Sequence, residues 1–222
     1  MKQLAADVWQ LRGTPPNVIN VYLIDDVLID AGSRYAGRRI LRQLRDREVN
    51  AHALTHAHPD HQGSSHEVCE KLGIPYWVGE NDVAAAEDPR LIGESQPNHP
   101  MTRFFARACT GPAHTVDRSL REGDEVGSFK VLDAPGHSPG HVAYWRESDR
   151  VLILGDVLTN INVSSGLPGL HEPKRYLTPD PARNRESARR LAKLEPTLVT
   201  FGHGAPLRDT RKFVEFVEAL PT

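Results

Sequence analysis

Blocks of apolar residues broken by polar turns run through the N-terminal part of the chain, and each block predicts one element. Val18–Asp25 (VINVYLID) and Val27–Asp30 (VLID) are β-branched, apolar runs joined by an acidic turn, which predicts a hairpin. Gly37–Asp46 (GRRILRQLRD) repeats its apolar residues at helical spacing and predicts an amphipathic helix. Ala51–Thr55 predicts a short strand that stops abruptly at the segment HAHPDHQGSS.

The remainder of the chain predicts strands and helices in alternation, with one irregular stretch. Asp88–His114 contains several Pro and Gly and predicts irregular chain, apart from a short helix over Met101–Ala108. The other predicted elements are a helix capped by Ser64 or Ser65 and ended at Gly73, strands Ile74–Val78, Phe129–Leu132, His141–Trp145, Val151–Leu154 and Thr197–Phe201, and helices Asp180–Leu194 and Thr210–Leu220.

Strands interleaved with helices through both halves predict an α/β protein. Because many of the strands are separated only by turns, a purely parallel sheet fits poorly. We therefore expect two mixed β-sheets packed face to face with helices on both outer faces, formed by residues 1–222 as one domain.

Composition narrows the classes of partner. The formal net charge of −2 gives no reason to expect nucleic acid, and no apolar run is long enough for a signal peptide or a membrane span. Cys69 and Cys109 are too few for a disulfide framework, which favours reduced thiols and the cytoplasm. We expect both cysteines to be buried and chemically inert.

The clearest chemistry lies directly after the predicted strand Ala51–Thr55. The segment His56-Ala57-His58-Pro59-Asp60-His61 holds four candidate metal ligands within six residues. The Pro59 ring excludes a regular helix through His58, so we expect an irregular loop in which the ligands converge. Imidazole and carboxylate together suit zinc, and also iron or manganese.

Four ligands in one loop are too many for a single tetrahedral ion, so further ligands are expected elsewhere. His137, Asp156 and His203 each follow an apolar strand and a small residue. Side chains at the same ends of neighbouring strands gather at one edge of a sheet. Taken singly, each is more often a hydrogen-bonded structural residue or a helix cap, but the whole set favours a metal site.

These motifs resemble those of the metallo-β-lactamase superfamily. THAHPDHQG, APGHSPGH, LGD and FGHG follow one another in the family's order after the opening hairpin VYLIDDVLIDAG, from about Asn17 to Gly204. The resemblance implies an αββα sandwich with two metal ions at one edge. It assigns His56, His58 and His137 to one ion and Asp60, His61 and His203 to the other, and it makes Asp156 the bridge. Asp30 resembles the acid that orients a ligand histidine.

The same resemblance implies a hydrolase. Two divalent ions, zinc first, with iron or manganese as alternatives, would share a water and supply a bridging hydroxide at neutral pH. Asp60 is expected to steer the proton of that water. The expected reaction is hydrolysis of an ester, thioester or lactone in a small or medium organic molecule.

Several alternatives remain open for the reaction. Asp156 in LGD departs from true β-lactamases, and Thr159 stands where acyl-homoserine lactonases usually have tyrosine. The motifs are closer to glyoxalase II, although the helical C-terminal region of that enzyme has no counterpart here. Persulfide dioxygenases, which use one iron, are the rival class, and β-lactam or phosphodiester hydrolysis and a non-enzymatic metal-binding module are further alternatives.

Substrate recognition is expected in two long segments. Asp88–Thr115 contains Phe104 and Phe105, which we expect to form an apolar lid or a homodimer contact, with core packing as the plainer alternative. In Thr159–Tyr176, His171 is the candidate substrate contact. His141 is predicted to be structural or to support a ligand, and His66 to lie on a helix.

Overall fold

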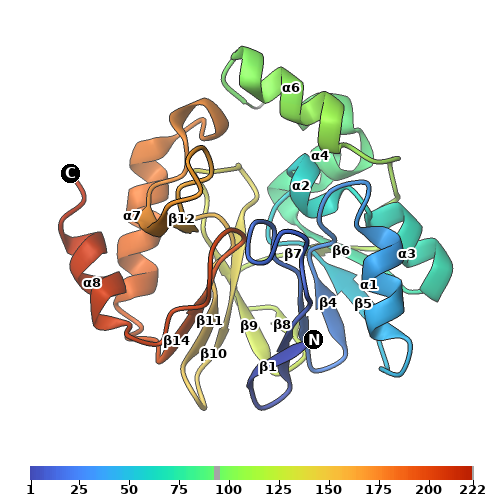
Figure 1. The fold of residues 1–222 in the computed structure, drawn as a ribbon, viewed down its shortest axis with the longest axis horizontal. Coiled ribbons are helices and arrows are strands. Elements are labelled where there is room, and N and C mark those ends of the chain that lie inside the picture. The colour runs from blue at the N-terminus through green and yellow to red at the C-terminus, as the bar shows by residue number, and fades with distance from the viewer. Residues whose placement is uncertain (93–95, 222) are drawn as a thin grey trace.

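The computed structural model describes residues 1–92 and 96–221, and two mixed sheets face one another at its centre (Figure 1). The first sheet has the order β1-β2-β3-β4-β5-β6-β7, formed by Lys2–Ala5, Val8–Gln10, Tyr22–Ile24, Val27–Ile29, Ala51–Ala53, Tyr76–Gly79 and Arg118–Leu120. The second has the order β14-β11-β10-β9-β8, formed by Leu198–Thr200, Val151–Ile153, Val142–Arg146, Phe129–Asp133 and Glu125–Val126.

Alternation of side chains along the strands creates three apolar layers. In β3, Tyr22 and Ile24 enter the core between the sheets, whereas Leu23 enters the core beneath the helices. In β10, Tyr144 faces the first sheet, and Ala143 and Trp145 lie on the opposite face. Each sheet is therefore buried on both sides, which requires helices on both outer faces.

Two pairs of helices supply that cover (Figure 1). Helices α1 (Gly37–Leu44) and α3 (Ser65–Leu72) pack against the first sheet, and α7 (Pro181–Ala192) and α8 (Arg211–Glu218) pack against the second. The predicted αββα sandwich is thus confirmed. No helix in the described part of the chain combines the length and apolar character needed to cross a bilayer.

The structure also contains elements that the sequence did not predict. The stretch 88–114, predicted to be largely irregular, contains η2 (Pro89–Leu91) and α6 (Pro100–Cys109), which is longer than the expected helix. Further unpredicted elements are β1, β2, β7, η1 (Glu80–Asp82), α4 (Val83–Glu87), the hairpin β12–β13 (Thr159–Ile161 and Pro168–His171) and η3 (Arg175–Leu177). Most are strands of three or four residues, too short to show a period.

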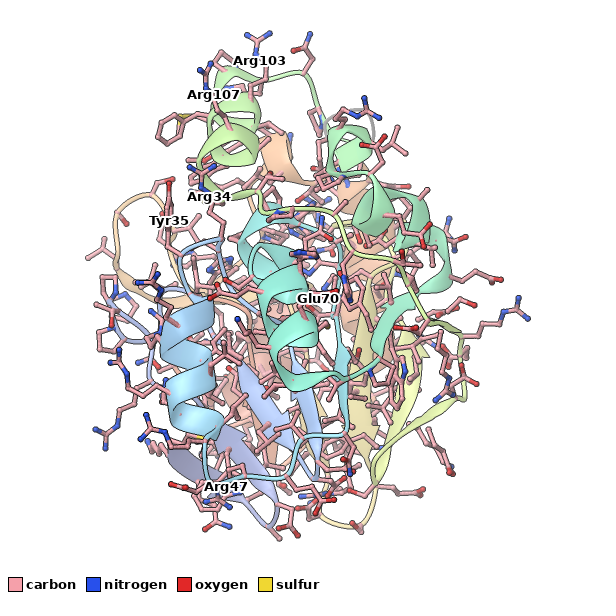
Figure 2. The ribbon with its side chains drawn as sticks, turned by 90° about the vertical axis from the view of Figure 1, so that its right-hand side faces the viewer. Arg34, Tyr35, Arg47, Glu70, Arg103 and Arg107 are labelled. Atoms are coloured by element: carbon pink, nitrogen blue, oxygen red, sulfur yellow. The ribbon has the colours of Figure 1, made fainter. Side chains whose placement is uncertain are left out.

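Helix α6 lies above the upper edge of the sandwich, apart from the four covering helices (Figure 1). Thr102 Oγ1 donates a hydrogen bond to the carbonyl oxygen of Tyr176 at 2.5 Å, and Arg34 N donates one to the carbonyl oxygen of Cys109 at 2.9 Å. Figure 2 shows Arg103 and Arg107 pointing away from the body of the protein. The opposite face of α6 therefore faces the edge where the predicted ligands lie.

Candidate metal centre

The first group of ligands lies where β5 gives way to a short helix. His58 has extended backbone (φ −95°, ψ 154°) and is the N-cap of α2 (Pro59–Gln62), in which Pro59 occupies the first turn. The sequence predicted an irregular loop through this whole segment, and the structure corrects that prediction from Pro59 onward. Proline excludes helix before itself but is favoured at the first helical position, because it has no N–H to leave unpaired.

The other predicted ligands follow strands of the second sheet. His137 comes after β9, Asp156 after β11 and His203 after β14. In the sheet, β14 is adjacent to β11, and β10 lies between β11 and β9. Strands β11 and β14 are parallel, so Asp156 and His203 leave the sheet at the same edge. The histidine-rich segment of the first sheet reaches that same edge, and the centre therefore spans both sheets.

Ligand atoms from these segments converge into three overlapping groups, each within 4.8 Å. The groups are His56, His58 and His137; His56, His61 and Asp156; and Asp60, His61 and His203. Asp156 Oδ2 lies 3.6 Å from both His61 Nε2 and His137 Nε2 and 3.1 Å from His203 Nε2. Its carboxylate is thus shared between the two halves of the cluster, as a bridging ligand must be.

The unpaired atoms of the cluster fit metal ions. Among the described residues, the buried Nε2 atoms of His56, His58, His61 and His137 and the buried Oδ1 of Asp156 have no hydrogen-bond partner. Buried polar atoms are almost always paired, so several orphans facing one centre require a ligand. The Nδ1 atom of His56 meets Thr55 Oγ1 at 3.0 Å and that of His137 meets Thr178 Oγ1 at 3.1 Å, contacts that fix the orientation of both rings.

The protonation states of the cluster also fit bound metal ions. Burial holds the pKa of His56 and His137 well below the usual value, and it lowers the pKa of His58 to about 4, so these rings are neutral donors. For His61, burial disfavours the charged form, but the carboxylates of Asp30 and Asp156 outweigh it and raise the pKa to about 10. The carboxylates therefore demand positive charge, which metal ions would supply in place of protons.

Asp30 lies behind the cluster, as the sequence predicted. Its Oδ2 accepts a hydrogen bond from His61 Nδ1 at 2.8 Å, and its Oδ1 accepts one from Thr55 N at 2.8 Å. Asp30 has a positive φ of 60°, in a region that few residues other than glycine, asparagine and aspartate adopt. The carboxylate thus orients the ring of one candidate ligand and anchors the strand end that carries the others.

His141 contacts the cluster through the backbone of a ligand. Its Nε2 accepts a hydrogen bond from Asp156 N at 3.0 Å, and its ring stacks on that of His56 with centroids 4.8 Å apart. His141 is outside the three ligand groups. The structure therefore places it where the sequence analysis expected a supporting residue.

An apolar cavity opens onto the cluster. Its floor contains candidate ligands and its walls are mainly apolar; it is lined by Val18, Ile19, His58, Pro59, Asp60, Ile92, Gln96, Thr102, Phe105, Ala106, His137, Asp156, Val163, Leu177 and His203. The two phenylalanines differ in their position relative to this cavity. Phe105 lines the cavity, whereas Phe104 is 60% exposed and His171 lies on β13, and neither belongs to the lining.

Two residues at the site escaped the sequence analysis. Asp82 is a buried carboxylate that binds backbone on both sides of the cluster, and Gln96 lines the cavity with its Oε1 buried and unpaired among the described residues. Asp82 lies three residues after Gly79, the last residue of β6, so the pattern of a strand, a small residue and then a ligand did not mark it. Gln96 lies in a stretch without periodicity, so no pattern marked it.

Comparison with known proteins agrees with this geometry. Residues 14–203 match the Metallo-beta-lactamase superfamily. The probable metallo-hydrolase YflN of Bacillus subtilis (strain 168) is 29% identical, over 89% of this chain and 84% of its own length. The metallo-beta-lactamase family protein TTHA1429 from Thermus thermophilus is 26% identical with a TM-score of 0.70, covering 98% of this chain and 80% of that one. The di-iron-bound form of TTHA1623 is 30% identical with a TM-score of 0.67, covering 90% and 93%.

Proposed function

This chain belongs to the metallo-β-lactamase superfamily and is similar to the probable metallo-hydrolase YflN, and we propose that it hydrolyses an ester, thioester or lactone of a small, partly apolar organic molecule. The observation that carries the proposal is the position of the shared Asp156 carboxylate between two ligand sets, at the floor of an apolar cavity.

The residues divide into two sets around Asp156. His56, His58 and His137 would hold one ion, and Asp60, His61 and His203 would hold the other. When bound, two divalent ions lower the pKa of water toward about 7 and polarise the attacked oxygen. Zinc suits this mixture of imidazole and carboxylate, and iron is supported by the di-iron form of TTHA1623.

Asp60 is the chain's own proton acceptor in this scheme. Its Oδ2 lies 3.3 Å from His203 Nε2, and it lines the cavity floor. Contact with His203 helps to lower the pKa of Asp60 against the opposing effect of burial, so the carboxylate is ionised at neutral pH. An ionised carboxylate at the floor can accept the proton of the attacking water and return it to the leaving group.

The cavity walls decide which substrate class fits. Val18, Ile19 and Leu177 offer apolar contacts, and the lining residues in the described part of the chain include no Lys or Arg. The described lining thus offers no cationic side chain to bind a charged group away from the metal ions, which favours substrates whose remaining part is neutral and apolar. Gln96 brings an amide to the same lining, a group that can donate a hydrogen bond to a polar atom of the substrate or accept one from it.

The full second ligand set favours a hydrolase over the rival oxygenase. An oxygenase of the persulfide dioxygenase kind needs one iron, whereas Asp60, His61 and His203 form a further ligand group here. The test pairs elemental analysis with a panel of ester, thioester, lactone, phosphodiester and β-lactam substrates. Hydrolysis of a neutral carbonyl substrate by protein with two ions per chain supports the proposal. One iron per chain with oxygen consumption contradicts it.

A further inference from the structure

A second cluster of metal-binding side chains lies on α3, outside the central site. His66 and Glu70 are four residues apart on this helix, so they share one face, one turn from each other. His114 reaches the same face from the segment that follows α6, 48 residues further along the chain than His66. The ligand atoms of these three residues all lie within 4.8 Å of one another.

The distance between the two imidazole nitrogens suits ligands to one ion. His66 Nδ1 and His114 Nδ1 face one another at 3.2 Å. Two nitrogen ligands at about 2.05 Å from a tetrahedral zinc ion are roughly 3.3 Å apart, which matches this separation. A hydrogen bond between the same atoms is the alternative, and it would use only one N–H donor.

Glu70 completes a set of three donors. Its Oε1 lies 3.9 Å from His114 Nδ1, and its side chain is 61% exposed and therefore free to rotate toward the nitrogens. Figure 2 shows Glu70 on the outward side of α3. The solvent side of the cluster leaves a fourth position for water, which gives an N₂O set plus water that suits Zn²⁺.

We propose that His66, Glu70 and His114 form a separate binding site for one zinc-class divalent ion. The ion would join α3 to the segment after α6. Because α6 contributes Thr102, Phe105 and Ala106 to the cavity, the ion would also hold one wall of the cavity in place. This site uses none of the central ligands, so it stands or falls independently of the proposed hydrolase activity.

Zinc binding to protein whose central site is already loaded tests the proposal. Equilibrium dialysis should find one more Zn²⁺ per chain in the wild type than in His66→Ala or His114→Ala, and Glu70→Gln should weaken that site about tenfold or more. His171→Ala, which removes a half-buried imidazole elsewhere, should bind zinc as the wild type does. Added zinc should raise the Tm of the wild type by about 5 °C and leave that of His114→Ala unchanged.

Equal zinc stoichiometry and affinity in the wild type, His66→Ala and His114→Ala would overturn the proposal and leave a hydrogen-bonded histidine pair. Glu70→Gln keeps the test decisive if a histidine variant folds poorly, because Glu70 is exposed on the helix surface. Unchanged zinc affinity in Glu70→Gln would remove the carboxylate from the site and contradict the three-ligand assignment.

Discussion

Asp82 accepts a hydrogen bond from Ser138 Oγ at 2.6 Å, which joins the end of β6 in the first sheet to the segment after β9 in the second. The same carboxylate accepts bonds from Ala57 N at 2.9 Å and Gly140 N at 2.7 Å. Ala57 lies between two candidate ligands, and Ser138 follows a third. One buried acid thus fixes the relative position of ligand segments from both sheets.

We predict that Asp82→Asn weakens metal binding by about 10–100-fold. The amide nitrogen of Asn would face a donor, so the three bonds could not all be kept. Competition with a chromogenic chelator measures the affinity. Asp88→Asn, a change of the same kind at an acid that bonds the side chain of Arg90, is the control and should bind metal as the wild type does. Equal affinity in both variants would contradict the positioning role of Asp82.

We predict that Asp60→Asn lowers turnover by about 10²–10⁴-fold, because it removes the proton acceptor. The fold should stay intact. Steady-state kinetics, metal analysis and circular dichroism check this. His141→Ala is the contrasting variant: it loses the bond from Asp156 N but no candidate ligand, so it should retain both metals. Wild-type turnover in a two-metal Asp60→Asn protein would refute the role assigned to this carboxylate.

Phe105→Ala should raise KM for an apolar ester or thioester by about tenfold, since it removes apolar contact worth roughly 1.5–3 kcal/mol when fully buried. Phe104→Ala is the matched control, because Phe104 is 60% exposed and outside the cavity lining. We expect its kinetics to equal those of the wild type. If Phe105→Ala changes only thermal stability, this part of α6 serves packing instead of recognition.

Removal of the central metals should lower Tm by about 5–10 °C, because metal binding favours the folded state by a few kcal/mol at concentrations well above Kd. Calorimetry before and after verified chelation measures the shift. Metal-free protein must balance the buried carboxylates of Asp30 and Asp156 with protonated His61 and His203 in place of the ions. An unchanged Tm would mean that the folded state gains nothing from its ions.

The Cys69 thiol should react with a disulfide reagent at pH 8 about a thousandfold more slowly than an ordinary cysteine. Burial raises its pKa from 9.0 to about 12, and nearby Asp117 and Glu70 act in the same direction. The reactive thiolate is therefore scarce until the pH approaches that value. Cys109 is only partly buried and should react first; labelling and mass spectrometry distinguish the two. Fast native-state labelling of Cys69 would contradict this prediction.

The strand ends account for most of what could be predicted from the sequence. An apolar run, a small residue and then His or Asp is a local pattern, and it marked His137, Asp156 and His203 before any contact was known. Topology then brings such ends to one edge. The role of Asp82 was not visible in this way, because its three donors come from segments that meet it only after both sheets have formed.

The walls of the cavity were harder to predict for a different reason. Phe104 and Phe105 are adjacent, and only the rotation of α6 about its axis decides which one faces the metals. That rotation is set by distant contacts, such as the bond from Thr102 to Tyr176. The position of His171 was hard to predict for a related reason. It lies on the hairpin β12–β13, and the two strands are too short to show a hydrophobic period in the sequence.

Division of the candidate ligands between the two sheets also ties metal binding to the packing of one sheet against the other. His56 and His58 reach a complete set only with His137, and Asp60 and His61 only with His203, so the first sheet alone offers no full cage. Long-range pairing of this kind forms late. Ions bound at this centre would meet a complete ligand set only once both sheets have packed, and the shape of that set can discriminate among metals in a way that a loose histidine-rich peptide cannot.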